Sequence, residues 1–475
     1  MVFSSLSFIF CFLPIFLFLN SFNYIYKKYT GGGNLLLIIS SLFFYIWGEN
    51  KGVFLLIILA LVNLGLGKSL ITVKIKKLNK LASFILFFGV FANLGTLFYY
   101  KYLFWILSQL IEIPIFSNIH LKEHALPLGI SFFTFHAISY LVDIYKNLIP
   151  QHKSSEFLAY FFMFPHLVAG PIVRFKDIHA DLQNRNRDFN LFAYGVFRFI
   201  LGVNKKVLIA NSVAPLADMA FIAEPSQIGT PFAWIGILAY TVQIYFDFSG
   251  YSDMAIGLAA MMGIRFHENF NSPYKADCIK DFWRRWHISL SSWLRDYLYI
   301  PLGGSRCSRI LNYRNLVIVF VLCGLWHGAA YTFLVWGLFH GLLLIFERTS
   351  LGQKLTSSPA FIRHSYAFLM VVIGWVFFRA ESLPRAFSYI GEMFSFNMKL
   401  EMFEYAGNLN ILAILIGLLI AFYGKNFKYN YDKSSNTLSI PNVGNLWMAI
   451  NLILFLVSIA YLYASNTNPF IYFNF

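Results

Sequence analysis

The sequence contains few charged residues. Asp, Glu, Lys and Arg make up 12% of its 475 residues, whereas 58% are hydrophobic and the mean hydropathy is +0.62. A soluble fold of this length cannot hide so much apolar surface, because much of its area must face water. The composition excludes an ordinary soluble enzyme and predicts an integral membrane protein that crosses the bilayer many times.

Cysteines and familiar catalytic motifs are also scarce. The chain has four cysteines and no C-x-x-C pair, so we expect neither a disulfide framework nor a metal site. It contains no P-loop, no G-x-S-x-G and no H-E-x-x-H motif, and no Ser or Cys nucleophile with an obvious base. We therefore expect no tightly bound cofactor.

The charge that is present is mainly basic, with a formal net charge of +15. The basic residues cluster between apolar segments, and cytoplasmic loops favour Lys and Arg, so membrane topology explains much of the excess. Residues 68–80, with five lysines and no acidic residue, are predicted to form such a loop. No groove-reading motif accompanies the charge, so nucleic acid is not an expected partner.

Apolar segments suited to membrane helices recur along the chain, and they predict an all-α polytopic protein with roughly eleven transmembrane helices. The clearest candidates lie near residues 4–20, 33–48, 53–70, 81–99, 126–144, 229–249, 314–333, 365–379, 408–424 and 444–464, and weaker or broken ones near 157–173, 190–212 and 334–347. No internal repeat is visible, which disfavours the architecture of many secondary transporters.

Residues 265–314 are too polar to span a membrane and too rich in Trp and Tyr for a free loop. Five aromatic or apolar residues recur there at helical spacing: Phe282, Trp286, Leu290, Trp293 and Tyr297. The pattern predicts an interfacial or re-entrant amphipathic helix. We expect residues 281–299 to enter the membrane plane without forming a straight span, with Trp283 and His287 near a central cavity.

Histidines in apolar surroundings are the main candidates for chemistry, because ionisable groups are costly at membrane depth. His327 lies in an apolar span between Gly324 and Gly328, which leave room for another backbone or a ligand. A neutral imidazole there can take a proton from a hydroxyl and pass it to a leaving group, although a hydrogen-bonded core histidine is an equal alternative. For His287, the alternative is an interfacial helix anchored by tryptophans, with arginines on lipid phosphates.

Two carboxylates, Asp247 and Asp253, are predicted near the end of a span. They could orient a histidine or pair with Arg284 or Arg285, and a polar helix terminus is an equal alternative.

His166 lies in a segment broken by two prolines, and such breaks are tolerated where the backbone lines a cavity. His136 is similarly isolated. A structural role is favoured for both histidines. A histidine beside arginines and Trp N–H donors suits acyl transfer from a thioester to an alcohol, and a proton-coupled transporter could use the same groups.

Several of these segments together resemble the membrane-bound O-acyltransferases, specifically their alginate O-acetyltransferase branch. The resemblance extends over nearly the whole chain, and the combination of its R-W-H and W-H-G motifs is specific. The matching stretches are FPHLVAGPIVR (164–174), QIYFDFSGYSD (243–253), FWRRWHISLS (282–291), YIPLGG (299–304) and GLWHG (324–328).

The resemblance implies tilted helices ringed around a thin central funnel. It makes residues 1–475 one acyltransferase domain, with an N-terminal helical region (1–125), a catalytic core (126–350) and C-terminal transmembrane helices (351–475). It implies that His327 is the catalytic histidine and His287 the second active-site histidine. The supporting residues would be Trp326, Trp283, Arg284, Arg285, Asp247, Asp253 and His166.

The resemblance also implies an activity. The chain would reside in the cell inner membrane and move acetyl groups from a cytoplasmic donor such as acetyl-CoA toward an extracytoplasmic polysaccharide such as alginate. A separate periplasmic acetyltransferase would be a partner. Peptidoglycan O-acetylation and D-alanyl transfer to teichoic acid are alternatives, and a proton-coupled transporter or flippase and a secretion scaffold are alternatives of other classes.

Overall fold

The protein folds into two compact units, each built from two stretches of the chain. The first comprises Met1–Phe199 and Met254–His267, and the second comprises Ile200–Asp253 and Glu268–Phe475. Their boundaries differ from those of the three regions inferred from the resemblance, and that division stays a prediction. The computed structural model describes residues 2–25, 32–49, 51–111, 125–185, 188–424, 427, 430–432, 437–439 and 444–465.

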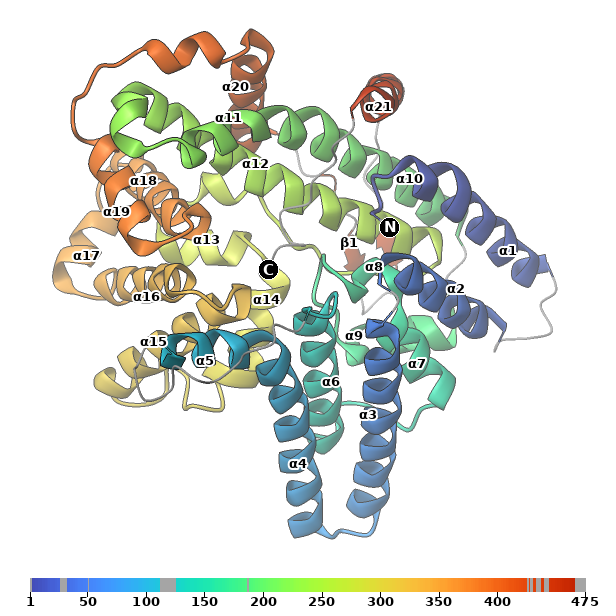
Figure 1. Ribbon diagram of the computed structural model, residues 1–475. Helices are drawn as coiled ribbons and strands as arrows, with labels where there is room; N and C mark the ends of the chain where they lie inside the picture. Colours follow the sequence, from blue (N-terminus) through green and yellow to red (C-terminus); the bar gives the residue numbers. More distant parts are fainter. Residues whose placement is uncertain are drawn as a thin grey trace. The chain divides into compact units, whose positions relative to one another are not determined.

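In the first unit, α3 (Gly52–Ile75) and α4 (Asn79–Leu97) form a hairpin alongside α6 (Ile130–Tyr145) (Figure 1). The turn of this hairpin lies in the lysine-rich stretch at residues 68–80. Asn63 and Asn93 are both buried and exchange side-chain hydrogen bonds of 3.0 and 2.8 Å, which join the two helices. Because each amide satisfies the other, two polar side chains are accommodated between apolar helices.

The rest of the first unit is also helical, and the segment predicted as broken at residues 157–173 is indeed interrupted. Helix α7 ends at Phe162, the short α8 ends at Leu167, and residues 168–173 are buried without regular structure. The remaining elements are η1 (Phe8–Phe12), α1 (Leu13–Ile25), α2 (Gly32–Gly48), η2 (Phe98–Tyr102), α5 (Leu103–Ile111), α7 (Ser154–Phe162), α8 (Phe164–Leu167), α9 (Phe175–Gln183) and most of α10 (Phe189–Asn204).

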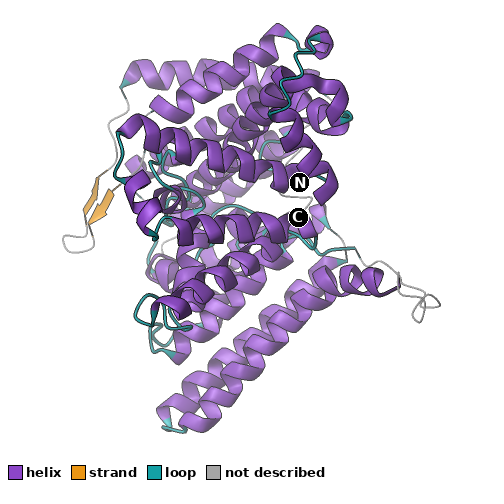
Figure 2. Ribbon diagram, turned by 90° about the vertical axis from the view of Figure 1, so that its left-hand side faces the viewer, coloured by secondary structure: helices purple, strands orange, loops and turns teal. Residues whose placement is uncertain are grey.

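The second unit holds most of the long α12 (Pro225–Met261), whose last turns belong to the first unit. Its other helices are η4 (Lys205–Ala210), α11 (Asn211–Ile222), η5 (Pro273–Lys275), α13 (Ile279–Arg285), α14 (Ile288–Leu294), η6 (Arg295–Tyr299), α15 (Arg309–His327), α16 (Tyr331–Phe346), α17 (Ser350–Thr356), α18 (Ala360–Arg379), α19 (Leu383–Met393), η7 (Glu401–Tyr405), α20 (Asn408–Tyr423) and α21 (Asn445–Ala464). A short antiparallel pair, β1 (Asn430–Asp432) with β2 (Thr437–Ser439), departs from the expected all-α fold (Figure 2).

Helices α15 and α16 pack closely through glycines. A Cβ at Gly324 would overlap the carbonyl oxygen of Phe333, and a Cβ at Gly337 would overlap that of Phe320. The room that Gly324 was expected to leave is therefore used by a neighbouring backbone. The predicted span at residues 314–333 is wrong at its end, because α15 stops at His327 and α16 starts at Tyr331.

The chain is a multi-pass membrane protein. Among the described residues, seven helices are long and apolar enough to cross a bilayer, or eight if the bent pair of α16 and α17 forms one span. Four shorter apolar helices accompany them, at Phe8–Ser21, Gly33–Gly48, Ile130–Tyr145 and Asn408–Tyr423. The expectation of roughly eleven spans around a funnel stays a prediction.

Candidate functional site

The segment predicted as one amphipathic helix is broken in the second unit. Helix α13 ends at Arg285 and α14 begins at Ile288, so the helical spacing of Phe282, Trp286 and later residues does not correspond to one helix. His287 lies at the break with φ 41° and ψ 55°, a left-handed conformation that few non-glycine residues adopt. The expectation that residues 281–299 form no straight span is confirmed.

The loop at residues 269–271 stabilises this break by binding the backbone on both sides. The amide of Ile288 donates to the carbonyl oxygen of Asn269 at 2.9 Å, and the amide of Asn271 donates to that of Arg285 at 2.9 Å. Backbone groups that an uninterrupted helix would satisfy are thus paired with the loop.

The imidazole of His287 is fully buried and held by Asn269. Its Nδ1 lies 3.0 Å from Oδ1 of Asn269, whose Nδ2 donates to Oγ of Ser252 at 3.0 Å. Nε2 is buried and has no hydrogen-bond partner in the described part of the chain. Burial lowers the pKa of His287 to about 3, which keeps the ring neutral. A neutral ring with an open nitrogen is equipped to exchange a proton.

His327, the last residue of α15, is 2% exposed and packs among aromatic rings. The rings of Trp336 and Phe378 both lie 5.1 Å from it in edge-to-face contacts. The ring of Trp326 lies 5.0 Å from that of His327 and 6.1 Å from that of His287. Trp326 therefore contacts both histidines, and the structure brings these three predicted site residues together.

A third buried histidine, His340, was missed by the sequence reasoning. The indole Nε1 of Trp283, a predicted site residue, donates to Nδ1 of His340 at 3.3 Å. The Trp336 ring packs against both His327 and His340, with ring centroids 5.1 and 5.2 Å apart. The spacing of Trp336 and His340, four residues apart in an apolar helix, is the sequence signal that could have found them.

The predicted carboxylates contact lysines instead of arginines. Asp247 pairs with Lys206 at 2.5 Å and Asp253 with Lys205 at 2.7 Å. The prediction that they pair with Arg284 or Arg285 is therefore wrong. They also do not lie at a helix terminus, because α12 continues to Met261.

The two predicted arginines differ in burial and in partners. Arg285 pairs with Asp281 of its own helix at 2.6 Å and also contacts the carbonyl oxygen of Asn271. Arg284 is exposed.

His166 belongs to the first unit, where it stacks on His136 with ring centroids 4.4 Å apart. Its Nε2 lies 2.8 Å from the carbonyl oxygen of Tyr160 and therefore donates to it. Both nitrogens of His136 and Nδ1 of His166 are buried without a hydrogen-bond partner among the described residues.

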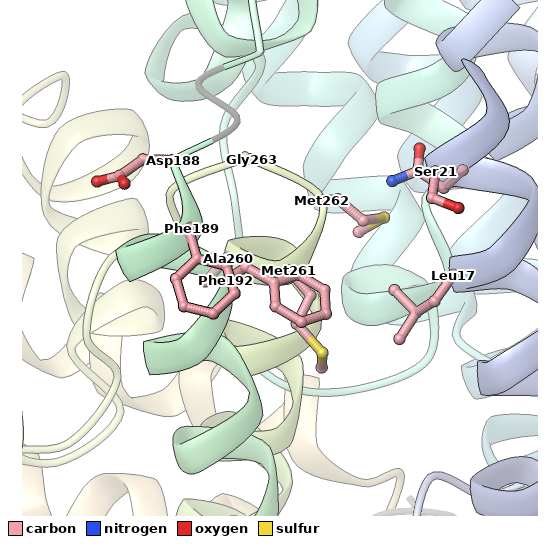
Figure 3. Close-up of a pocket in the computed structure, with 10 residues that line it drawn as sticks. Leu17, Ser21, Asp188, Phe189, Phe192, Ala260, Met261, Met262 and Gly263 are labelled. Carbon is pink, nitrogen blue, oxygen red and sulfur yellow. The ribbon is translucent and has the colours of Figure 1, made fainter. Parts of the chain in front are cut away.

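A cavity of about 330 Å³ lies in the first unit (Figure 3). Leu17 and Ser21 border it on one side, and Phe189, Phe192 and Met261 on another. None of the predicted site residues lines it. Within the described ranges, no group of three or more His, Cys, Asp or Glu could hold a metal ion.

Comparison with known proteins gives consistent matches. The model of MBOAT, the membrane-bound O-acyltransferase family, matches residues 84–389. The chain is 41% identical to a protein of Pseudomonas putida named probable alginate O-acetylase AlgI, over the full length of both. It is 34% identical to the peptidoglycan O-acetyltransferase of Helicobacter pylori, over 100% of this chain and 98% of that one. A teichoic acid D-alanyltransferase of Streptococcus thermophilus is 29% identical over 54% of this chain and 66% of its own length.

Proposed function

Because the chain belongs to the membrane-bound O-acyltransferase family, we propose that it supplies acetyl groups for the O-acetylation of a cell-surface polysaccharide, with alginate as the acceptor. Membership of the family makes it a multi-pass O-acyltransferase. Full-length relatives at about 40% identity carry the name alginate O-acetylase, which favours alginate over other glycans.

The observation that carries the proposal is the buried cluster of His287, Trp326 and His327. His287 is neutral, held through Nδ1, and has Nε2 open, while Trp326 contacts both histidine rings. Acyl transfer to a hydroxyl requires a group that removes the hydroxyl proton and a site that excludes competing water. The cluster provides ring nitrogens for the first requirement and close aromatic packing for the second.

The reaction would use these residues as follows. A histidine ring nitrogen accepts the proton of the acceptor hydroxyl as its oxygen attacks the acyl carbonyl of a thioester. The C–S bond breaks, and the thiolate takes the proton back from the imidazolium. We assign this proton transfer to the pair His327 and His287, with the Trp326 ring holding their relative orientation.

The donor and the location are part of the same proposal. An acetyl thioester, acetyl-CoA, would reach the enzyme from the cytoplasmic side of the inner membrane. The lysines at residues 68–80 support a cytoplasmic position for the turn between α3 and α4. A periplasmic acetyltransferase would pass the group to the polysaccharide.

Peptidoglycan is the second candidate acceptor, because the peptidoglycan O-acetyltransferase of Helicobacter pylori matches this chain over its whole length. The D-alanyltransferase matches only about half of the chain and is a weaker guide. Both alternatives keep the same class of reaction and the same histidines. They differ from the main proposal in the polymer that would carry the ester.

Replacing His327 with Ala tests the proposal. Polymer O-acetylation in membranes that contain normal amounts of the variant should fall by about 100-fold or more, because general acid–base catalysis is worth about 10²–10⁴. His267→Ala is a matched control, since the His267 side chain is 67% exposed and lies in the first unit. Undiminished acetylation by the His327 variant would show that His327 is not the catalytic histidine. Ester groups found on peptidoglycan instead of alginate would show that peptidoglycan is the acceptor.

A further inference from the structure

We propose that Asn269 is a positioning residue that holds His287 in the tautomer with the proton on Nδ1 and the lone pair on Nε2. The inference rests on the proposed function, since it states how His287 is prepared to accept a proton. It adds an uncharged side chain, 18 residues before His287, to the machinery.

The orientation of the Asn269 amide follows from its neighbours. The backbone N–H of Ser289 lies 3.3 Å from the Asn269 side chain, and a backbone N–H can only donate, so the atom that it meets is the oxygen. Oγ of Ser289 donates to this same oxygen at 2.8 Å. The amide nitrogen then faces Oγ of Ser252 at 3.0 Å, where a hydroxyl oxygen accepts. All three contacts agree on one amide orientation.

The tautomer of His287 follows from the amide. Oδ1 of Asn269 can only accept, so Nδ1 of His287, 3.0 Å away, must carry the hydrogen. In the neutral ring the lone pair is then on Nε2, which is buried and has no partner in the described ranges. The ring of Phe248 meets the imidazole edge-to-face at 4.7 Å and limits its rotation. The base and its orienting group thus have the arrangement expected of an activated histidine.

Two balanced steps follow for His287. The acceptor hydroxyl gives its proton to Nε2 while its oxygen bonds to the carbonyl carbon of the acyl thioester. The C–S bond then breaks, and the departing thiolate takes the proton from Nε2. Nδ1–H stays with Asn269 throughout, so the ring needs no rotation between the steps.

The Asn269 amide is uncharged, so it orients His287 without favouring the protonated form of the ring. The carboxylates of α12 have cationic partners, because Asp247 pairs with Lys206 and Asp253 with Lys205. On α13, Arg285 pairs with Asp281, and Lys280 and Arg284 are exposed. The other histidines of the cluster are His327 of α15 and His340 of α16. A carboxylate at position 269 would therefore add the first negative charge in hydrogen-bond contact with His287, and it would favour the protonated ring.

The test is the pH profile of acetyl transfer by Asn269→Asp in membranes that contain the full-length chain together with its periplasmic acetyltransferase, with acetyl-CoA and a short alginate oligosaccharide. Aspartate keeps an oxygen for His287 and Ser289, and Oγ of Ser252 can turn to donate to it. We expect the acid limb of kcat/KM to move up by about one pH unit or more, because protonated His287 cannot accept the hydroxyl proton. Asn408→Asp makes the same change at an exposed position of the second unit and should leave the profile at the wild-type position.

Asn269→Leu provides the second readout. It removes the Oδ1 acceptor and keeps the branching of the side chain, and only the longer 3.4 Å contact of Nδ1 with Oγ of Ser289 is left, so kcat should fall by about tenfold or more while KM for acetyl-CoA changes little. An Asn269→Asp profile that coincides with wild type, at normal membrane levels, would overturn the inference. If the wild-type membranes themselves transfer no acetyl group, the proposed function fails instead, so the two failures are distinct.

Discussion

The ammonium group of Lys206 lies 2.5 Å from the carboxylate of Asp247, and each of these side chains is only 2% exposed. Lys206 comes from the π-helical η4 and Asp247 from the middle of α12. A close approach of the two helices accompanies the pair, because a Cβ at Gly250 would lie 3.2 Å from the backbone nitrogen of Lys206. Two buried charges therefore hold a close helix contact in the second unit.

This pair gives a first prediction about stability. Lys206→Met leaves the Asp247 carboxylate buried without its cation, and the free energy of unfolding should fall by about 3–5 kcal/mol. The double variant Lys206→Met, Asp247→Leu removes both charges and should recover most of the loss. Thermal unfolding of the purified protein in detergent measures both. A single variant as stable as wild type would show that the pair contributes nothing.

The glycine contact between α15 and α16 gives a second prediction. Gly324→Ala places a methyl group on the backbone of Phe333, so it should destabilise the protein by about 1–3 kcal/mol and reduce acetyl transfer by shifting His327. Gly391→Ala is the matched control, because a Cβ there meets nothing within 4 Å. That variant should be stabilised by about 0.5–1 kcal/mol, as expected for Ala over Gly within a helix. Equal stabilities for the two variants would contradict the close packing.

The stacked histidines of the first unit give a third prediction. His166→Phe removes the donor to the carbonyl oxygen of Tyr160 and should cost about 0.5–1.5 kcal/mol. His136→Phe keeps an aromatic ring and removes two buried nitrogens without partners in the described chain, so it should be neutral or stabilising. Unfolding temperatures of the two variants in detergent decide this. Greater damage from His136→Phe than from His166→Phe would mean that His136 binds a polar group.

The sequence indicates the candidate histidines because ionisable residues in apolar segments are conspicuous. His287 and His327 both lie in the buried cluster of the second unit, as does Trp326. Asn269 does not stand out in the sequence, because its role depends on a hydrogen bond to His287 that only the structure shows. The assignment of catalytic roles to these residues remains a prediction.

Local spacing also fails where partners are distant in sequence. The lysine partner of Asp247 lies 41 residues earlier, and the arginines that the sequence suggested lie 37 and 38 residues later, so separation in sequence does not distinguish them. Similarly, the apolar period from Phe282 to Tyr297 continues through a helix break. The break depends on hydrogen bonds from the loop at residues 269–271, which no periodicity within residues 281–299 can report.

The left-handed backbone at His287 has a consequence for which side chains position 287 can carry. At φ 41°, a β-branched residue would be strained by its own geometry, while Asn, Asp and Gly adopt this conformation more readily. The backbone conformation therefore limits which residues can replace His287 without strain, whatever their side-chain chemistry. Of these three, only asparagine also carries an N–H that can donate to Oδ1 of Asn269, whereas glutamine, closer to histidine in length, lacks that backbone tolerance.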